Sequence, residues 1–159
     1  KVEDSLDLVN EILQKINTIK KKTYRIKPKI YFEEWDDPYI SATRWVSEII
    51  EISGGVDIFA KKSRSQKALK RAVSSQDVIN KNPDIIFASW CGKKVNFDKI
   101  KKRKGWSSIN AVKTNSLFEI KSPIILQPGP AALTDGLSQI HDLILQWQKS
   151  QICSNENFS

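Results

Sequence analysis

The amino-acid sequence predicts an α/β fold: a three-layer lobe with a mainly parallel sheet, preceded by a long helix. Short apolar segments alternate along the chain with amphipathic helical patterns, which is the order expected of parallel strands joined by helices. The apolar segments also lack the alternation of a half-exposed strand. We therefore expect helices to cover both faces of the sheet.

The first predicted element is a helix of about five turns over residues 2–19. Acidic side chains lie near its start and lysines near its end, an arrangement that stabilises a helix through its dipole. Pro28 then precedes a buried strand at residues 29–33. The apolar residues of the helix recur at steps of three and four: Val2, Leu6, Val9, Leu13 and Ile16.

A polar and aromatic loop is expected over residues 33–39, followed by a second helix. Ser41 or Thr43 caps this helix, its apolar residues share one face, and a glycine pair ends it. A short strand is predicted at residues 56–59. The basic segment at residues 61–71 has no clear periodicity, so no element is assigned to it.

The second half of the chain is predicted to hold two more strands and three more helices. The strands lie at residues 84–88 and 117–120, because these runs are apolar. Pro130 suits the first turn of the last helix. The other predicted elements are a helix capped by Ser74 or Ser75, a helix at residues 98–103 and a turn at Gly105-Trp106.

Composition limits the class of protein. The chain has 159 residues, 40% apolar and 28% charged, which suits one globular domain with a core. Its net charge is +8, but the densest basic run, residues 101–104, ends a helical pattern; a solvated helix end is favoured over nucleic-acid binding. No run approaches the about 18 apolar residues of a membrane span. Because the sequence contains no Met, we expect a processed or trimmed piece of a longer protein.

Motifs for catalysis, phosphate binding and metal binding are missing from the sequence. No glycine-rich phosphate loop and no nucleophile elbow is present. His141 lies in an apolar helical pattern, and Cys91 and Cys153 are far apart, so no zinc site is expected and Cys91 is interpreted as a buried packing residue. The acids of residues 33–37 leave metal binding or acid–base chemistry open, although a solvated loop is the ordinary explanation. We therefore expect no catalytic residue, cofactor or resident metal.

Ligand binding is predicted where the strands end. In open parallel sheets, ligands lie beyond the carboxyl ends of the strands. Trp35, Tyr39 and Trp90 are in or beside loops at this edge, where a large flat ligand could stack on them; the alternative is that they cover the end of the sheet. The segments that leave the sheet at this edge are residues 33–39, 90–94 and 121–128.

Six collinear segments carry a resemblance to a known family: YFEEWDDP at 31–38, then residues 45–59, 72–75, 82–87, 104–106 and 128–130. With them, the chain resembles the C-terminal lobe of the substrate-binding proteins of cobalamin and iron-siderophore ABC transporters. It is most similar to the cobalamin-binding branch. The resemblance extends from the opening helix to about Trp147.

The resemblance implies two α/β lobes joined by one rigid helix, with the ligand held between them. Residues 1–23 are then part of the interdomain helix, residues 24–150 form the C-terminal substrate-binding lobe, residues 151–159 form a flexible tail, and the N-terminal lobe is absent. The implied location is the periplasm, or the outer side of the cytoplasmic membrane with a lipid anchor. The implied role is to carry a metal-chelate ligand to a permease.

The resemblance also implies contact residues. In relatives, a surface glutamate after the Val-Ser motif docks onto permease arginines; the matching Gln76 has no charge, so the neighbouring Asp77 would have to replace it. Trp35 and Trp90 would supply apolar faces, and Lys93 a charge for a phosphate. The expected ligand-binding residues are Glu33, Trp35, Tyr39, Trp90, Cys91, Lys93, Ser122 and Gln127, of which Tyr39 and Gln127 would bond to amide side groups.

Three hypotheses about function remain open at this point. The first is a non-catalytic lobe that binds cobalamin or a related corrinoid. The second keeps this role but changes the ligand to haem, a ferric siderophore or another metal chelate, for which the acidic run at residues 33–37 is mildly unfavourable. The third is half of a two-lobed α/β enzyme that uses Glu33 or Asp37, since architecture does not fix function. A homodimer of such lobes is also compatible with the sequence.

Overall fold

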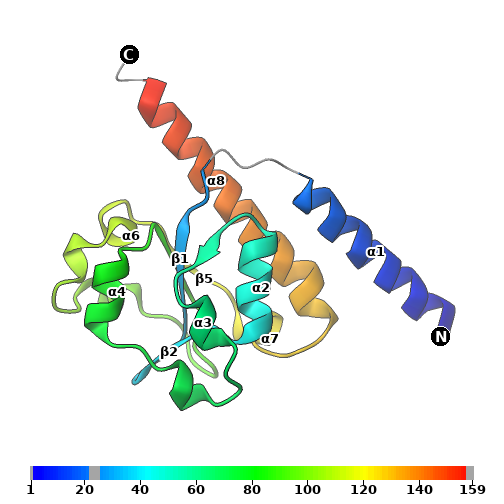
Figure 1. Cartoon of the computed structure of the whole chain (residues 1–159), viewed down its shortest axis with the longest axis horizontal. Helices are drawn as coiled ribbons and strands as arrows, with labels where there is room; N and C mark the ends of the chain where they lie inside the picture. Colours follow the sequence, from blue (N-terminus) through cyan, green and yellow to red (C-terminus); the bar gives the residue numbers. More distant parts are fainter. Residues whose placement is uncertain (1, 22–25, 157–159) are drawn as a thin grey trace.

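A mainly parallel sheet forms the centre of the structure, a computed structural model that describes residues 2–21 and 26–156 (Figure 1). The strands follow the order β2-β1-β4-β5, and β3 pairs with β1 beside β2. The pairings are parallel except for that of β2 with β1. The strands are β1 (Lys29–Asp36), β2 (Tyr39–Ser41), β3 (Val56–Asp57), β4 (Ile85–Ala88) and β5 (Leu117–Glu119).

Helices cover both faces of this sheet, as predicted. In Figure 1, α4 and α6 lie on one side of the sheet, and α2 and α8 lie on the other. The covering helices are α2 (Arg44–Ile52), α7 (Ser122–Ile125) and α8 (Leu137–Glu156) on one face, and α4 (Ser75–Lys81), α5 (Phe97–Lys101) and α6 (Asn110–Lys113) on the other. The predicted α/β fold with a mainly parallel sheet is therefore confirmed.

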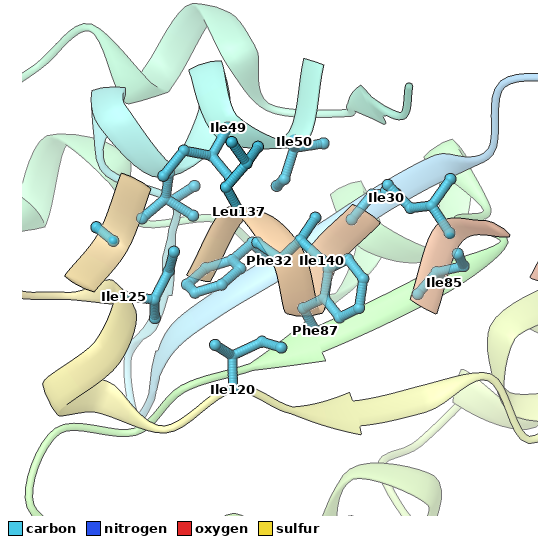
Figure 2. Packing of buried hydrophobic residues seen from close by; sticks show 14 of the residues in the cluster. Ile30, Phe32, Ile49, Ile50, Ile85, Phe87, Ile120, Ile125, Leu137 and Ile140 are labelled. Atoms are coloured by element: carbon cyan, nitrogen blue, oxygen red, sulfur yellow. The ribbon is translucent and has the colours of Figure 1, made fainter. Parts of the chain in front are cut away.

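Alternate residues of the central strands fill two separate cores. Phe32 and Phe87 point into the core under α2 and α8, where they pack against isoleucines and Leu137 (Figure 2). Tyr31 and Ile86, their neighbours in the chain, belong to the opposite core. Both residues of each pair are fully buried, which explains why these strands are apolar without alternation.

The prediction of a loop over residues 33–39 is wrong for most of that segment. β1 continues to Asp36, with a bulge between Glu33 and Trp35, and β2 returns from Tyr39. Only Asp37 and Pro38, joined by a cis peptide bond, form the turn. The acidic side chains continue the strand because cationic partners from distant segments neutralise them, as described below.

Several smaller elements also differ from the prediction. β3 ends at Asp57, two residues short of the predicted strand, and the basic segment forms α3 (Ala60–Ser63) and the 3-10 turn η1 (Ala68–Arg71). A helical turn, α7, lies in the third predicted loop. The last helix does begin at Pro130, but it passes through the π-helical turn η3 (Ala132–Gly136). Residues 151–156, expected in a flexible tail, continue α8, and residues 157–159 lie outside the described residues.

The caps and the predicted turn follow the sequence more closely. Ser74 caps α4 through a capping box with Asp77. Thr43 precedes α2 in an extended conformation, but its side chain makes no capping hydrogen bond. Gly105 has φ +82°, in the left-handed region that favours glycine, and begins the 3-10 turn η2 (Trp106–Ser108).

The opening helix, α1 (Val2–Lys20), lies alongside α8 at the edge of the structure (Figure 1). Ile12 and Ile19 are buried, and Lys15 donates hydrogen bonds to the Thr134 carbonyl and to Ser138. A neighbouring stripe of apolar side chains stays exposed: Leu6, Val9 and Leu13. Among the described helices, none is long and apolar enough to cross a membrane.

Candidate functional site

A buried carboxylate organises the carboxyl edge of the sheet. Glu33 is 0% exposed and accepts hydrogen bonds from Trp90 Nε1 (3.0 Å) and from the Tyr31 hydroxyl (3.1 Å). Arg103 donates from both terminal nitrogens, at 2.7 and 2.9 Å. This carboxylate, predicted to touch ligand, is thus fully occupied within the lobe and fixes Trp90 and Arg103 in place. It has no free oxygen for acid–base chemistry on a substrate.

Tyr31 and Arg103 are held in the protonation states that their hydrogen bonds to Glu33 require. Burial raises the pKa of the Tyr31 phenol well above its ordinary value, and the Glu33 charge raises it further, so the hydroxyl remains a donor. Burial opposes the charge on Arg103, but its hydrogen bonds to Glu33 and the charge of Glu33 together outweigh that effect and raise the pKa of the guanidinium. Arg103 therefore remains a charged donor to Glu33.

A second buried carboxylate, Asp36, lies at the end of β1. Its side chain is 0% exposed, and its two oxygens pair with two different cations, Lys93 and Lys99, the latter at 2.7 Å. Burial alone would raise the pKa of Asp36, but the hydrogen bonds from both lysines outweigh this effect and lower the pKa below its ordinary value. Asp36 thus joins the segment after β4 to α5.

Lys93 brings two of the predicted tryptophans together. Its Nζ lies 4.2 Å from the centroid of the Trp35 ring and 5.0 Å from that of Trp90. Trp35 is half-buried, and Trp90 is only 4% exposed. The two rings share one rim, with Trp35 the more accessible of the two.

Tyr39 lies opposite Asp36 in the hairpin formed by β1 and β2. The Arg103 guanidinium lies 4.2 Å from the Tyr39 ring centroid and 4.4 Å from that of Trp106. The rings of Tyr39 and Trp106 meet edge-on at 5.7 Å, and Trp106 Nε1 donates to the Ser75 hydroxyl at 2.7 Å. Arg103 therefore contacts the Tyr39 ring and, at the same time, forms the ion pair with Glu33.

A hollow of about 420 Å³ opens beside this hairpin. Lys99 and Arg103 line it, although neither was singled out from the sequence, where the basic residues of this segment indicated a solvated helix end. Their spacing of four residues would place both on one face of a helix, which is the signal that could have found them. The polar residues that line the hollow are Asp36, Asp37, Tyr39, Ser75, Lys99 and Arg103.

The remaining predicted ligand residues lie on the other two segments. Cys91 is exposed, so its interpretation as a buried packing residue is wrong. Ser122 is half-buried in the first turn of α7, and Gln127 is exposed in the turn after it. Among the described residues, neither side chain forms a hydrogen bond with the tryptophan rim. The described residues also contain no group of His, Cys, Asp and Glu suited to hold a metal ion.

The two residues expected to dock to a permease lie at the start of α4. Gln76 is exposed and donates to Asn80 Oδ1 at 2.8 Å. Asp77 is exposed too, but its carboxylate accepts from the Ser74 backbone and hydroxyl at 3.1 and 2.7 Å. These hydrogen bonds lower the pKa of Asp77. The charge of Asp77 is therefore already used to stabilise its own helix.

The lowered pKa of Asp36 predicts a pH-dependent contribution to stability. A carboxylate with a depressed pKa in the folded state stabilises the fold above its unfolded pKa, about 3.9, and loses this effect as the pH falls towards the folded value. In chemical denaturation, we expect the gap in unfolding free energy between wild type and Asp36→Asn to be constant near neutral pH and to shrink below about pH 4. Asp98→Asn, an exposed acid on α5, controls for the lost charge. A gap for Asp36→Asn that persists unchanged at pH 3 would contradict this assignment.

The sequence is similar to that of a known protein family and of one bacterial relative. Residues 3–124 match the family described as periplasmic binding protein. Over 139 residues, the chain is 24% identical to an uncharacterized ABC transporter substrate-binding lipoprotein, YvrC, of Bacillus subtilis (strain 168), covering 86% of this chain and 40% of the relative.

Two solved structures share the fold. The vitamin B12 binding protein BtuF of Vibrio cholerae matches with a TM-score of 0.62 and 21% identity, over 92% of this chain and 53% of that one. S. aureus IsdE, complexed with heme, matches with a TM-score of 0.63 and 23% identity, over 87% and 55% of the two chains. The chain thus spans about half the length of these solved proteins.

Proposed function

Because the chain belongs to the periplasmic binding protein family, we propose that it forms one lobe of the solute-binding component of an ABC importer and binds cobalamin or a related corrinoid for delivery to a permease. The family match confirms the predicted resemblance, and with the lipoprotein relative it confirms the predicted location outside the cytoplasmic membrane. The family is one of binding proteins rather than of enzymes.

The observation that carries this proposal is the aromatic rim. Trp35 offers a half-buried indole face at the end of β1, and Trp90 lies beside it, held by Glu33. A corrin ring is broad and apolar on its faces, so it suits stacking on such a rim. The similar fold of a vitamin B12 binding protein supports the choice of ligand.

We propose that the ligand is held between this lobe and a second one, as the family resemblance implies. In this proposal, a second lobe completes the cleft, and the apolar stripe on α1 is part of the connection. Each stacked aromatic contributes on the order of 1 kcal/mol beyond burial, whereas micromolar affinity requires about 8 kcal/mol. A single lobe is therefore expected to bind its ligand weakly.

We propose that this lobe contacts a permease without a dominant acidic side chain. Gln76 supplies no charge, and Asp77 is engaged in the capping box of α4. We expect docking through this lobe to depend less on a single acidic side chain than in relatives with a glutamate at this position.

Equilibrium dialysis against cyanocobalamin, followed by corrinoid absorbance, tests the proposed ligand. Trp35→Ala is expected to weaken binding about five- to tenfold, since about 1.4 kcal/mol corresponds to a factor of ten. Trp147→Ala, a half-buried tryptophan on α8, is the matched control and is expected to keep wild-type affinity. Failure to bind cyanocobalamin up to millimolar concentration, by the 159-residue chain and by a two-lobed form, would refute the corrinoid proposal.

A second candidate ligand is haem or a ferric siderophore. The fold of a protein solved in complex with heme supports this alternative. Competition between cyanocobalamin and hemin in one dialysis experiment separates the two. Displacement of hemin by equimolar cyanocobalamin supports the corrinoid, and the reverse supports the anionic chelate.

A further inference from the structure

The hollow beside the β1–β2 hairpin is physically joined to the tryptophan rim. Asp36 pairs through one oxygen with Lys93, whose ammonium lies over Trp35, and through the other with Lys99, which lines the hollow. A ligand stacked on Trp35 therefore has the hollow within reach of its side groups. At about 420 Å³, the hollow falls within the size range of small-molecule pockets, roughly 300–1,000 Å³, and is larger than one side group needs.

The charges around the hollow balance. Two carboxylates, Asp36 and Asp37, and two cations, Lys99 and Arg103, line it, and the buried carboxylate Asp36 has cations as its partners. A site without net charge gives no general attraction to an anion or to a cation, so it does not select ligands by charge alone.

The hollow nevertheless offers both a hydrogen-bond acceptor and donors. Asp37 is exposed at the hairpin turn, and among the described residues no hydrogen bond or ion pair occupies its carboxylate. Lys99 gives one hydrogen bond to Asp36, and its ammonium carries two further donors. Asp37 lies close enough to Lys99 for the two charges to interact. An acceptor and a donor therefore face one space.

A primary carboxamide satisfies both partners at once. Its NH₂ group donates to Asp37, and its carbonyl oxygen accepts from Lys99. A carboxylate in the same place also accepts from Lys99, but it meets the like charge of Asp37 and can donate nothing to it. An alkylammonium meets the opposite problem at Lys99 and Arg103. The arrangement therefore favours a neutral group with both donors and an acceptor.

We propose that this hollow is a subsite for the carboxamide side groups of the ligand, and that it favours chelates whose rim carries amides over chelates whose rim carries carboxylates. The proposal rests on the proposed function, because it assumes a metal chelate stacked on Trp35. It assigns Asp37 and Lys99 as specificity-determining residues of the lobe.

Two corrinoids that share one ring and one metal test this subsite. Dicyanocobinamide carries amide side groups, and dicyanocobyrinic acid carries carboxylates in their place. In equilibrium dialysis, wild type is expected to bind the amide form about tenfold more tightly, a difference near 1.4 kcal/mol. Asp37→Asn removes the like charge and retains a carbonyl acceptor, so the ratio is expected to fall to about threefold or less. Asp142→Asn, exposed on α8, makes the same charge change and is expected to keep the wild-type ratio.

The outcomes distinguish failure of the subsite from failure of the proposed function. If wild type binds dicyanocobinamide but Asp37→Asn keeps the full preference, or Asp142→Asn loses it equally, the subsite is refuted and the proposed function stands. An equal affinity of wild type for both corrinoids also refutes the subsite. If neither the 159-residue chain nor a two-lobed form binds either corrinoid up to millimolar concentration, the proposed function is refuted with it. Trp35→Ala is expected to weaken both probes equally, because they stack through the same ring.

Discussion

Replacing Arg103 with alanine is expected to lower the free energy of unfolding by about 3–5 kcal/mol, because a buried ion pair broken on one side leaves an uncompensated charge. Glu33 is 0% exposed and receives two of its hydrogen bonds from this guanidinium. The substitution also removes the contacts of Arg103 with the rings of Tyr39 and Trp106. Urea denaturation, monitored by circular dichroism, measures the loss.

Two further variants separate the buried charge from a general effect of losing an arginine. Arg64→Ala removes an exposed arginine after α3 and is expected to change stability by no more than about 0.5 kcal/mol. The double variant Glu33→Gln, Arg103→Met removes both charges and is expected to be more stable than Arg103→Ala alone. Equal costs for Arg103→Ala and Arg64→Ala would show that Glu33 is not held by this pair.

The parts of the fold that were predicted are those set by local sequence. β4 was found because all of its residues are buried between two helical layers and are apolar. The end of β1 was not found, because its acids resemble a solvated loop. Their partners come from far along the chain: Arg71 for Glu34, Lys93 for Asp36 and Arg103 for Glu33. The pattern of apolar residues within a short stretch of sequence cannot indicate such long-range ion pairs.

The positions of some site residues, but not of others, could be predicted from the sequence. The rule that ligands lie beyond the carboxyl ends of parallel strands directed attention to this edge, and Trp35 and Trp90 do lie together there. The basic lining of the hollow was missed, because Arg103 was considered only as part of a basic helix end and Lys99 was not singled out. Cys91 was expected inside but is exposed, since β4 ends at Ala88 and Cys91 already belongs to the turn that follows.

Replacing Trp106 with alanine is expected to lower the free energy of unfolding by about 3–5 kcal/mol, the usual cost of truncating a buried aromatic side chain. Trp106 is 0% exposed although its sequence predicted only a turn. It packs edge-on against Tyr31 and Tyr39, with centroid distances of 6.1 and 5.7 Å, and donates to Ser75. Its loss leaves a cavity beneath the hollow and removes the support of Tyr39, so cyanocobalamin affinity is expected to fall as well.

Two comparisons identify the source of that loss. Trp106→Phe keeps most of the buried ring but leaves the Ser75 hydroxyl without its donor, so it is expected to cost less than alanine. Trp147→Ala removes a half-buried tryptophan from α8, in the opposite core, and is expected to destabilise the fold without a change in ligand affinity. The proposed role of Trp106 would be wrong if Trp106→Ala were no more destabilising than Trp147→Ala. It would also be wrong if both variants left ligand affinity unchanged, because the core that holds Tyr31 and Trp106 would then not support the tryptophan rim. Because the Trp106 ring contacts both Tyr39 and Arg103, we expect that, of these two tryptophans, Trp106 alone lowers both stability and binding when it is replaced by alanine.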